Sequence, residues 1–326
     1  MAADSTRTGR IVIVAGPGRS GTSSFAGTLA RLGLHVPEPV VKPNATNPAG
    51  FYEPRWVVDF HNRLLVRAAV RNLDLSPDAR ARAERTAAKP GVRAKLRGWL
   101  GDVLENQGSQ LVIKDPRSSW FPRLWVETAG EFGIAPGFVT MLRHPAEVST
   151  SRQTYYGEDQ PVSEQRANNI ARIGGWINGA LGAERASRGS ARAFVPYTDL
   201  VADWRQTITR VGAALDLDYD PAPDVDPHPV DEFIDPSLRR IRVDWDDVDI
   251  PDSLRDVGER AWQALSRLAT EGADSPQAID AVDQVAADYA TLHADAQALS
   301  RHDVWRMRVD TRRRTERAAK SDEPSA

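Results

Sequence analysis

The chain has 326 residues, of which 41% are hydrophobic and 27% charged, enough for one large domain or two ordinary ones. It contains no cysteine, which excludes disulfides, thiol catalysis and thiolate metal sites. A formal net charge of -3 gives no overall attraction to nucleic acid, so no nucleic-acid partner is expected. Because no run of about 18 apolar residues is present and the start lacks a secretory signal, we expect no membrane span and a cytoplasmic location.

The first predicted element is a buried strand. The continuous apolar run at residues 11–14 is typical of a strand covered on both faces, as in a parallel sheet. The spacing of Phe25, Leu29 and Leu32 then predicts a helix that Gly33 can end. Between strand and helix lies the glycine- and hydroxyl-rich stretch GPGRSGTS.

Three more apolar runs are predicted to be strands of the same sheet: 111–113, 138–142 and 193–195. Helical patterns separate them, at about 56–70, 91–105 and 163–188. Strands that alternate with helices predict an α/β layered fold with a central, mostly parallel sheet.

After residue 216 the alternation of predicted strands and helices ends. A proline-rich acidic loop comes first, and helical patterns resume at 252–268 and 276–299. We interpret them as a helical C-terminal extension, from about residue 250, of a single domain that spans residues 11–319. Residues 1–10 are expected to be a flexible N-terminus and residues 320–326 a disordered tail.

The glycine-rich loop is suited to hold an anion. Its glycines allow a ligand to approach the backbone closely, and the helix that follows directs N–H groups and the positive end of its dipole there. Arg19 adds a fixed positive charge, and the alternative is a plain glycine turn. The predicted anion-binding residues are Gly18, Arg19, Ser20, Gly21, Thr22 and Ser23.

The loop differs from the P-loop of nucleotide triphosphatases in one position. Gly16 and Gly21 have the spacing of G-x-x-x-x-G-K-[ST], but Thr22 stands where that motif has lysine. This argues against ordinary ATP or GTP hydrolysis. A P-loop-type small-molecule kinase remains an alternative.

The segment GPGRSGTSS resembles the 5′-phosphosulfate loop of the sulfotransferase family, in the R-S-G-T-S form often seen in bacterial members. The donor substrate of that family is 3′-phosphoadenosine-5′-phosphosulfate (PAPS). Two later segments resemble the family in the same order. Arg143 and Ser151, eight residues apart after a predicted strand, are similar to the pair that holds the donor's 3′-phosphate. Tyr197, in YTDL, is similar to a tyrosine near the adenine, and Asp199 is expected to be a helix N-cap.

The resemblance implies a three-layer P-loop-like fold and a PAPS-dependent enzyme that needs no metal. Taken alone, Arg143 and Ser151 also fit an arginine that caps a sheet and a solvent-facing serine. The family's C-terminal segment around the 3′-phosphate has no clear match, and Arg239 and Arg240 are the cations in that region.

Candidate catalytic residues follow from the same resemblance. Lys114 ends a predicted strand, but Pro116 stands where many eukaryotic members carry the histidine base. Glu53, in NPAGFYEPRW, is similar to the glutamate of the N-x-x-G-[FY]-x-E segment in bacterial members, where it can act as general base. Its alternative is a charge at a helix N-terminus. His61 is a second candidate base, with a satisfied histidine as the alternative.

The function that these patterns imply is in-line transfer of a sulfuryl group from PAPS to a hydroxyl of a small-molecule, sugar or lipid acceptor. Glu53, Lys114, Arg19 and His61 are the predicted catalytic residues. The alternatives are the kinase and a non-catalytic family member that only binds nucleotide. The oligomeric state stays open, a homo-oligomer included.

Overall fold

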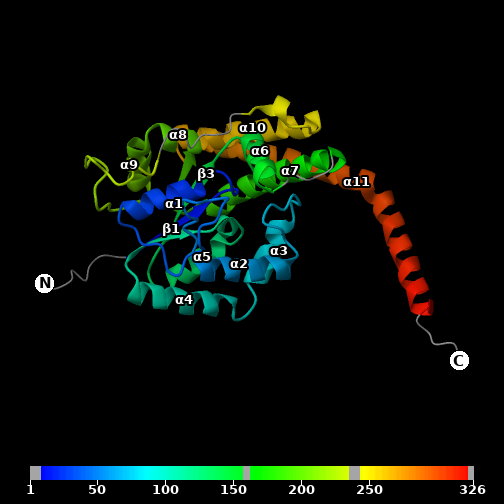
Figure 1. Cartoon of the computed structure of the whole chain (residues 1–326), viewed down its shortest axis with the longest axis horizontal. Coiled ribbons are helices and arrows are strands. Elements are labelled where there is room, and N and C mark those ends of the chain that lie inside the picture. Colours follow the sequence, from blue (N-terminus) through cyan, green and yellow to red (C-terminus); the bar gives the residue numbers. More distant parts are fainter. Residues whose placement is uncertain (1–8, 157–161, 235–242, 322–326) are drawn as a thin grey trace.

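A four-stranded parallel sheet lies at the centre of the computed structural model, which describes residues 9–156, 162–234 and 243–321 (Figure 1). Its order is β2–β1–β3–β4, and every pair of neighbouring strands is parallel. The strands are β1 (Arg10–Ala15), β2 (Gln110–Lys114), β3 (Gly137–Leu142) and β4 (Arg192–Pro196). All four predicted strands and the α/β fold class are confirmed.

Helices connect and cover the strands, and together they make up most of the chain. The first group is α1 (Thr22–Arg31), α2 (Arg55–Ala68), α3 (Ala79–Ala87), α4 (Val92–Asn106), the short η1 (Pro116–Trp120) and α5 (Pro122–Gly130). The second group is α6 (Pro145–Tyr156), α7 (Val162–Ser187), α8 (Tyr197–Ala202), α9 (Trp204–Leu215), η3 (Trp245–Asp247), α10 (Asp252–Thr270) and α11 (Pro276–Ser321).

Alternating residues of the strands supply two buried faces. Ile11 and Ile13 face a core formed with α2, α3, α4 and α5. Phe194 continues that face under β4, where α7, α10 and α11 pack. Val12 and Val14 face the opposite side, covered by α1, α8 and α9. The result is the three-layer arrangement that the continuous apolar strands indicate.

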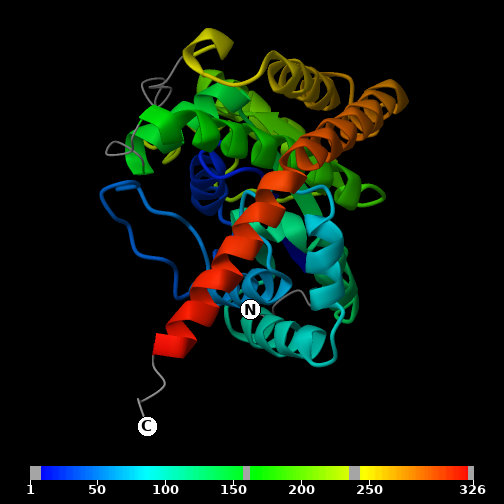
Figure 2. The same cartoon turned by 90° about the vertical axis from the view of Figure 1, so that its right-hand side faces the viewer.

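The last helix is longer than the sequence predicts. Its apolar pattern was expected to end near residue 299, but α11 continues to Ser321 because no glycine or proline interrupts the arginine-rich segment that follows. Figures 1 and 2 show α11 leaving the body of the molecule. No helix among the described residues is long and apolar enough to cross a membrane.

Candidate functional site

The glycine-rich loop lies between the end of β1 and the start of α1, at the carboxyl edge of the sheet where ligands of open α/β sheets bind. Two glycines are required by close contacts. Gly16 has φ 121°, and a Cβ there would lie 2.6 Å from the carbonyl oxygen of Met141. Gly21 has φ 86°, and a Cβ there would collide with the ring of Tyr197. The backbone of the loop is therefore held tightly between β3 and α8.

Two observations at this loop fit a bound anion. The Ser20 hydroxyl is fully buried and has no hydrogen-bond partner in the described part of the chain. No side chain in the part of the chain that the structure describes caps the N-terminus of α1, which begins directly after Gly21. Buried hydroxyls and first-turn N–H groups are nearly always satisfied, and a phosphate or sulfate oxygen would satisfy both.

Arg19 joins the loop to the helix that follows β3. It adopts a positive φ of 77°, unusual for a residue with a side chain. Its Nε donates to the Ser151 hydroxyl at 3.0 Å, and its Nη1 donates to the carbonyl oxygen of Thr46 at 3.4 Å. Ser151 is only 1% exposed, so it is not the solvent-facing serine of the alternative interpretation.

Arg143 lies on the other side of the same loop. Its Nη1 donates to the Arg19 carbonyl oxygen at 3.2 Å, and its Nε donates to Glu147 at 2.8 Å. The guanidinium lies over the ring of Tyr197, 5.2 Å from the ring centre. The structure thus brings together Arg19, Ser151, Arg143 and Tyr197, which the sequence separates by up to 178 positions.

Glu147 is a residue of this cluster that sequence reasoning missed. Its signal was the i,i+4 spacing from Arg143. A carboxylate at that position fixes the direction of the guanidinium.

A buried ion pair lies at the end of β2. Lys114 Nζ donates to Glu53 Oε1 at 2.5 Å and to the Ser23 hydroxyl at 3.2 Å. The side chains of Lys114 and Glu53 are 3% and 11% exposed. Because Ser23 belongs to the first turn of α1, this pair sits directly beside the anion-binding loop.

The segment at residues 44–53 covers this region. Asn47 Nδ2 donates to the Ser23 hydroxyl at 3.1 Å and to the Gly50 carbonyl oxygen at 2.7 Å. Glu53 lies outside α2, which begins at Arg55, and its carboxylate is directed to Lys114. The segment is therefore attached to the loop at Ser23 and to β2 through Glu53.

His61 is held inside the core. Its Nδ1 is 2.8 Å from Asp115 Oδ2, and its Nε2 accepts from the Trp125 indole N–H at 3.3 Å. The histidine and the aspartate are both fully buried. With both ring nitrogens engaged, His61 is the satisfied histidine of the alternative interpretation and is not a candidate base.

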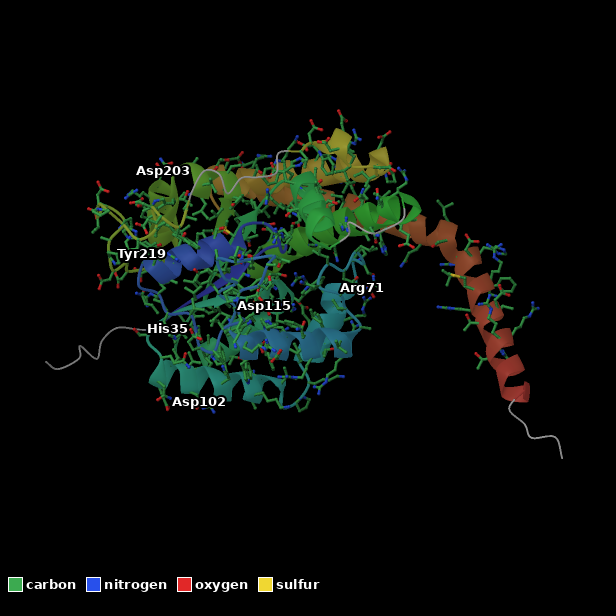
Figure 3. All side chains as sticks on the ribbon, viewed as in Figure 1. His35, Arg71, Asp102, Asp115, Asp203 and Tyr219 are labelled. Atoms are coloured by element: carbon green, nitrogen blue, oxygen red, sulfur yellow. The ribbon has the colours of Figure 1, made fainter. Side chains whose placement is uncertain are left out.

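Asp115 connects this histidine to the turn after β2, in the interior of the molecule (Figure 3). Burial alone would raise the pKa of Asp115, but the hydrogen bond and charge of His61 and the charge of Arg117 outweigh it and bring the pKa to about 2. Arg117 Nη1 donates to Asp115 Oδ1 at 2.7 Å, so the two side chains form an ion pair. The pair fixes the turn that follows Lys114.

Asp199 is not an N-cap: Pro196 precedes α8, and Asp199 lies within the first turn of that helix. Arg239 and Arg240 lie outside the described residues. Within the described ranges, no group of three or more His, Cys, Asp or Glu side chains could hold a metal ion.

Comparison with known proteins gave matches among solved structures. No protein-family model and no curated protein matches this chain. It is similar to the sulfotransferase domain of the Synechococcus PCC 7002 olefin synthase, with 17% identity and a TM-score of 0.45 over 82% of this chain and 98% of that chain. It is also similar to the sulfotransferase domain from the curacin biosynthetic pathway, with 15% identity and a TM-score of 0.41 over 80% and 98% of the two chains.

A third similar structure is a sulfotransferase from Mycobacterium tuberculosis H37Rv, with 17% identity and a TM-score of 0.41 over 70% of this chain and 74% of that chain. All three are sulfotransferases or sulfotransferase domains. With TM-scores below 0.5, they add nothing to the description of the site, which rests on the contacts within the chain.

Proposed function

We propose that this protein transfers a sulfuryl group from PAPS to a hydroxyl group of an acceptor. The observation that carries the proposal is the convergence of three elements: the loop with its unpaired buried Ser20 hydroxyl, the Arg19–Ser151–Arg143 cluster, and the Lys114–Glu53 pair. The end of the site at Arg143 and Ser151 suits a 3′-phosphate, and the end at Lys114 and Glu53 suits a reacting sulfuryl group.

The loop and its neighbours would hold the donor. The Ser20 hydroxyl and the first N–H groups of α1 would bind the 5′-phosphosulfate, and Arg143 with Ser151 would bind the 3′-phosphate. Tyr197, 5% exposed and packed against both the loop and Arg143, would lie beside the adenine. Bound there, PAPS supplies an activated sulfur–oxygen bond.

Glu53 and Lys114 would act on the transfer itself. The acceptor hydroxyl oxygen forms a bond to sulfur while the bond from sulfur to the bridging phosphate oxygen breaks, and the hydroxyl proton passes to the Glu53 carboxylate. Lys114 carries the charge suited to stabilise the departing oxygen. Ser23, which accepts hydrogen bonds from both Lys114 and Asn47, fixes the position of the ammonium.

The 2.5 Å separation of the Glu53 carboxylate and the Lys114 ammonium supports this division of work, since it places both groups where β2 ends, beside one loop. We favour this activity over that of a kinase because Thr22 replaces the P-loop lysine, and because Arg143 and Ser151 have no part in a kinase mechanism.

The test is a thermal melt with excess adenosine 3′,5′-bisphosphate, the donor product, beside Mg-ATP and ADP. A ligand at 100 times its dissociation constant adds about 2.7 kcal/mol of stability. We expect a shift with the bisphosphate, followed by transfer of ³⁵S from labelled PAPS to members of a hydroxylated acceptor panel. A shift with Mg-ATP alone would favour the kinase, and binding without transfer to any acceptor would favour the non-catalytic alternative.

A further inference from the structure

A groove on the outer side of the molecule lies between α2 and α4, away from the loop. It has a volume of about 540 Å³, and none of its lining residues belongs to the loop or to the cluster around Arg143. Figure 3 shows Asp102, one of its lining residues, on α4 at the edge of the molecule, whereas Asp115 lies toward the middle. The groove is therefore separate from the site proposed for sulfuryl transfer.

The floor of the groove is aromatic. Trp56 stacks on Trp99 with ring centres 4.9 Å apart and planes 4° from parallel, and it stacks on Phe60 at 4.8 Å. Both indoles are only partly buried. Because Trp56 is stacked against Phe60 and Trp99, the stack presents its ring edges to the groove, and the face of another ring can pack against those edges in a T-shaped arrangement.

Three cations surround this floor: Arg63 and Arg67 from α2, and Lys95 from α4. All are exposed, and none has an ion-pair or hydrogen-bond partner within the described part of the chain. Other arginines on these helices do form ion pairs. On the same two helices, Arg55 pairs with Asp59, and Arg97 pairs with Glu131.

Asp102 is the one acidic residue that lines the groove, so its lining carries three positive charges and one negative charge beside the aromatic rings. Like charges held near one another raise the energy of the empty groove, and an anion placed among them lowers it. The aromatic floor adds a preference for an apolar, flat body.

From these charges and rings, we propose that the groove between α2 and α4 binds a small aromatic anion. The face of the ligand's ring system packs against the exposed ring edges of Trp56 and Trp99, and its single carboxylate, sulfonate or sulfate group lies among Arg63, Arg67 and Lys95. The proposal goes beyond sulfuryl transfer and does not depend on it, because the two sites share no residue.

The probe is 8-anilinonaphthalene-1-sulfonate, an aromatic sulfonate, compared with N-phenyl-1-naphthylamine, which has the same rings without the charge. Each is titrated by fluorescence into the whole chain, with and without saturating adenosine 3′,5′-bisphosphate. The test variant is Arg63→Gln/Lys95→Gln, which removes one unpaired cation from each helix. The matched control is Arg55→Gln/Arg97→Gln, which removes one paired cation from each helix and the same total charge.

We expect saturable binding of the sulfonate to one site, weakened about fivefold in the test variant and changed less than about twofold in the control. Binding of the uncharged analogue should not distinguish the variants, and the bisphosphate should not compete. Circular dichroism and melting temperature verify that both variants are folded.

Several results would overturn the proposal. If the affinity for the sulfonate falls equally in the test and control variants, the effect is one of overall charge and not of this groove. If the bisphosphate competes with the sulfonate, the probe binds at the glycine-rich loop instead. Sulfonate binding that is no tighter than that of the uncharged analogue would remove the role of the cations. If the monomeric protein does not bind the sulfonate but binds anionic lipid vesicles, and the test variant loses that binding, the groove is a membrane-contact surface instead. If the protein self-associates and the test variant does not, the groove is an interface with a second copy of the chain.

Discussion

The Glu53 carboxylate and the Lys114 ammonium lie 2.5 Å apart and are almost completely enclosed, although 61 positions separate them in the chain. They meet because segment 44–53 returns across the carboxyl edge of the sheet where β2 ends. Removing one partner of a buried ion pair leaves an uncompensated charge, which costs about 3–5 kcal/mol.

The first prediction concerns the stability that this pair provides. Glu53→Gln and Lys114→Met should each lower the free energy of unfolding by about 3 kcal/mol, and the double variant should lose less than the sum. Urea unfolding of the unchanged protein, the two single variants and the double variant gives the coupling free energy between the two side chains. Strictly additive losses would mean that the two charges do not depend on each other.

The second prediction separates chemistry from binding at Glu53. Glu53→Gln should reduce turnover by about 100-fold or more, since general-base catalysis contributes at least that factor. Its affinity for adenosine 3′,5′-bisphosphate should be unchanged, because the loop and Arg143 hold that ligand. Asp59→Asn, an exposed carboxylate on α2, is the control. Full activity in Glu53→Gln would exclude Glu53 as the base.

The third prediction concerns the 3′-phosphate. Arg143→Ala should weaken adenosine 3′,5′-bisphosphate by more than about tenfold and leave the affinity for adenosine 5′-monophosphate unchanged, because a charge-assisted contact to one phosphate is lost. Isothermal titration calorimetry gives both affinities. Arg123→Ala, whose side chain is 81% exposed on α5, is the control. An equal loss for both nucleotides would place Arg143 at a different part of the ligand.

The fourth prediction concerns the attachment of segment 44–53. Asn47→Ala removes the hydrogen bonds to Ser23 and Gly50 and should expose this segment to protease cleavage several-fold more often than in the unchanged protein. Limited proteolysis followed by mass spectrometry measures it. Addition of adenosine 3′,5′-bisphosphate should protect the unchanged protein more than the variant, and equal protection would show that Asn47 does not connect the segment to the loop.

The fifth prediction follows from the depressed pKa of Asp115. The carboxyl has a pKa of about 2 in the folded chain, against an ordinary value of 3.8, so its charged form stabilises the fold above about pH 4. This contribution, about 2 kcal/mol, is lost as the pH falls from about 4 to about 2. Asp115→Asn should therefore flatten the acid limb of a plot of stability against pH, whereas Asp102→Asn on the surface should not. An unchanged slope would contradict the role of the His61–Asp115 pair.

Much of the fold could be predicted because its strands are buried on both faces. Continuous apolar runs such as residues 11–14 are distinctive, and the strands were placed within two residues of their observed ends. The start of α8 was wrong: Asp199 was expected to cap it, but the helix begins at Tyr197, and its six residues are too few for a periodic pattern that would locate its ends. The end of α11 was also wrong: its apolar spacing stops near residue 299, while helix propensity alone continues it.

The site was predictable in part. The glycine pattern indicated the loop, and the resemblance to sulfotransferase motifs indicated Arg143 and Glu53, but the contacts that join them depend on which strands are neighbours. The placement of β1 between β2 and β3 brings Lys114 and Arg143 to opposite sides of one loop. His61 could not be assigned from sequence because its role depends on Asp115 and Trp125, 54 and 64 positions away.

The last helix extends far beyond the part of it that is packed against the domain. Its first turns are anchored by Val282, Val285 and Tyr289, and all described side chains beyond residue 293 are exposed except the half-buried Val309. At about 1.5 Å per residue, the exposed part reaches roughly 40 Å, so a tilt of about 10° at its base moves the tip by about 7 Å. Small rearrangements of α10 against α11 are thus magnified at the far end, where a fluorescent label would report them.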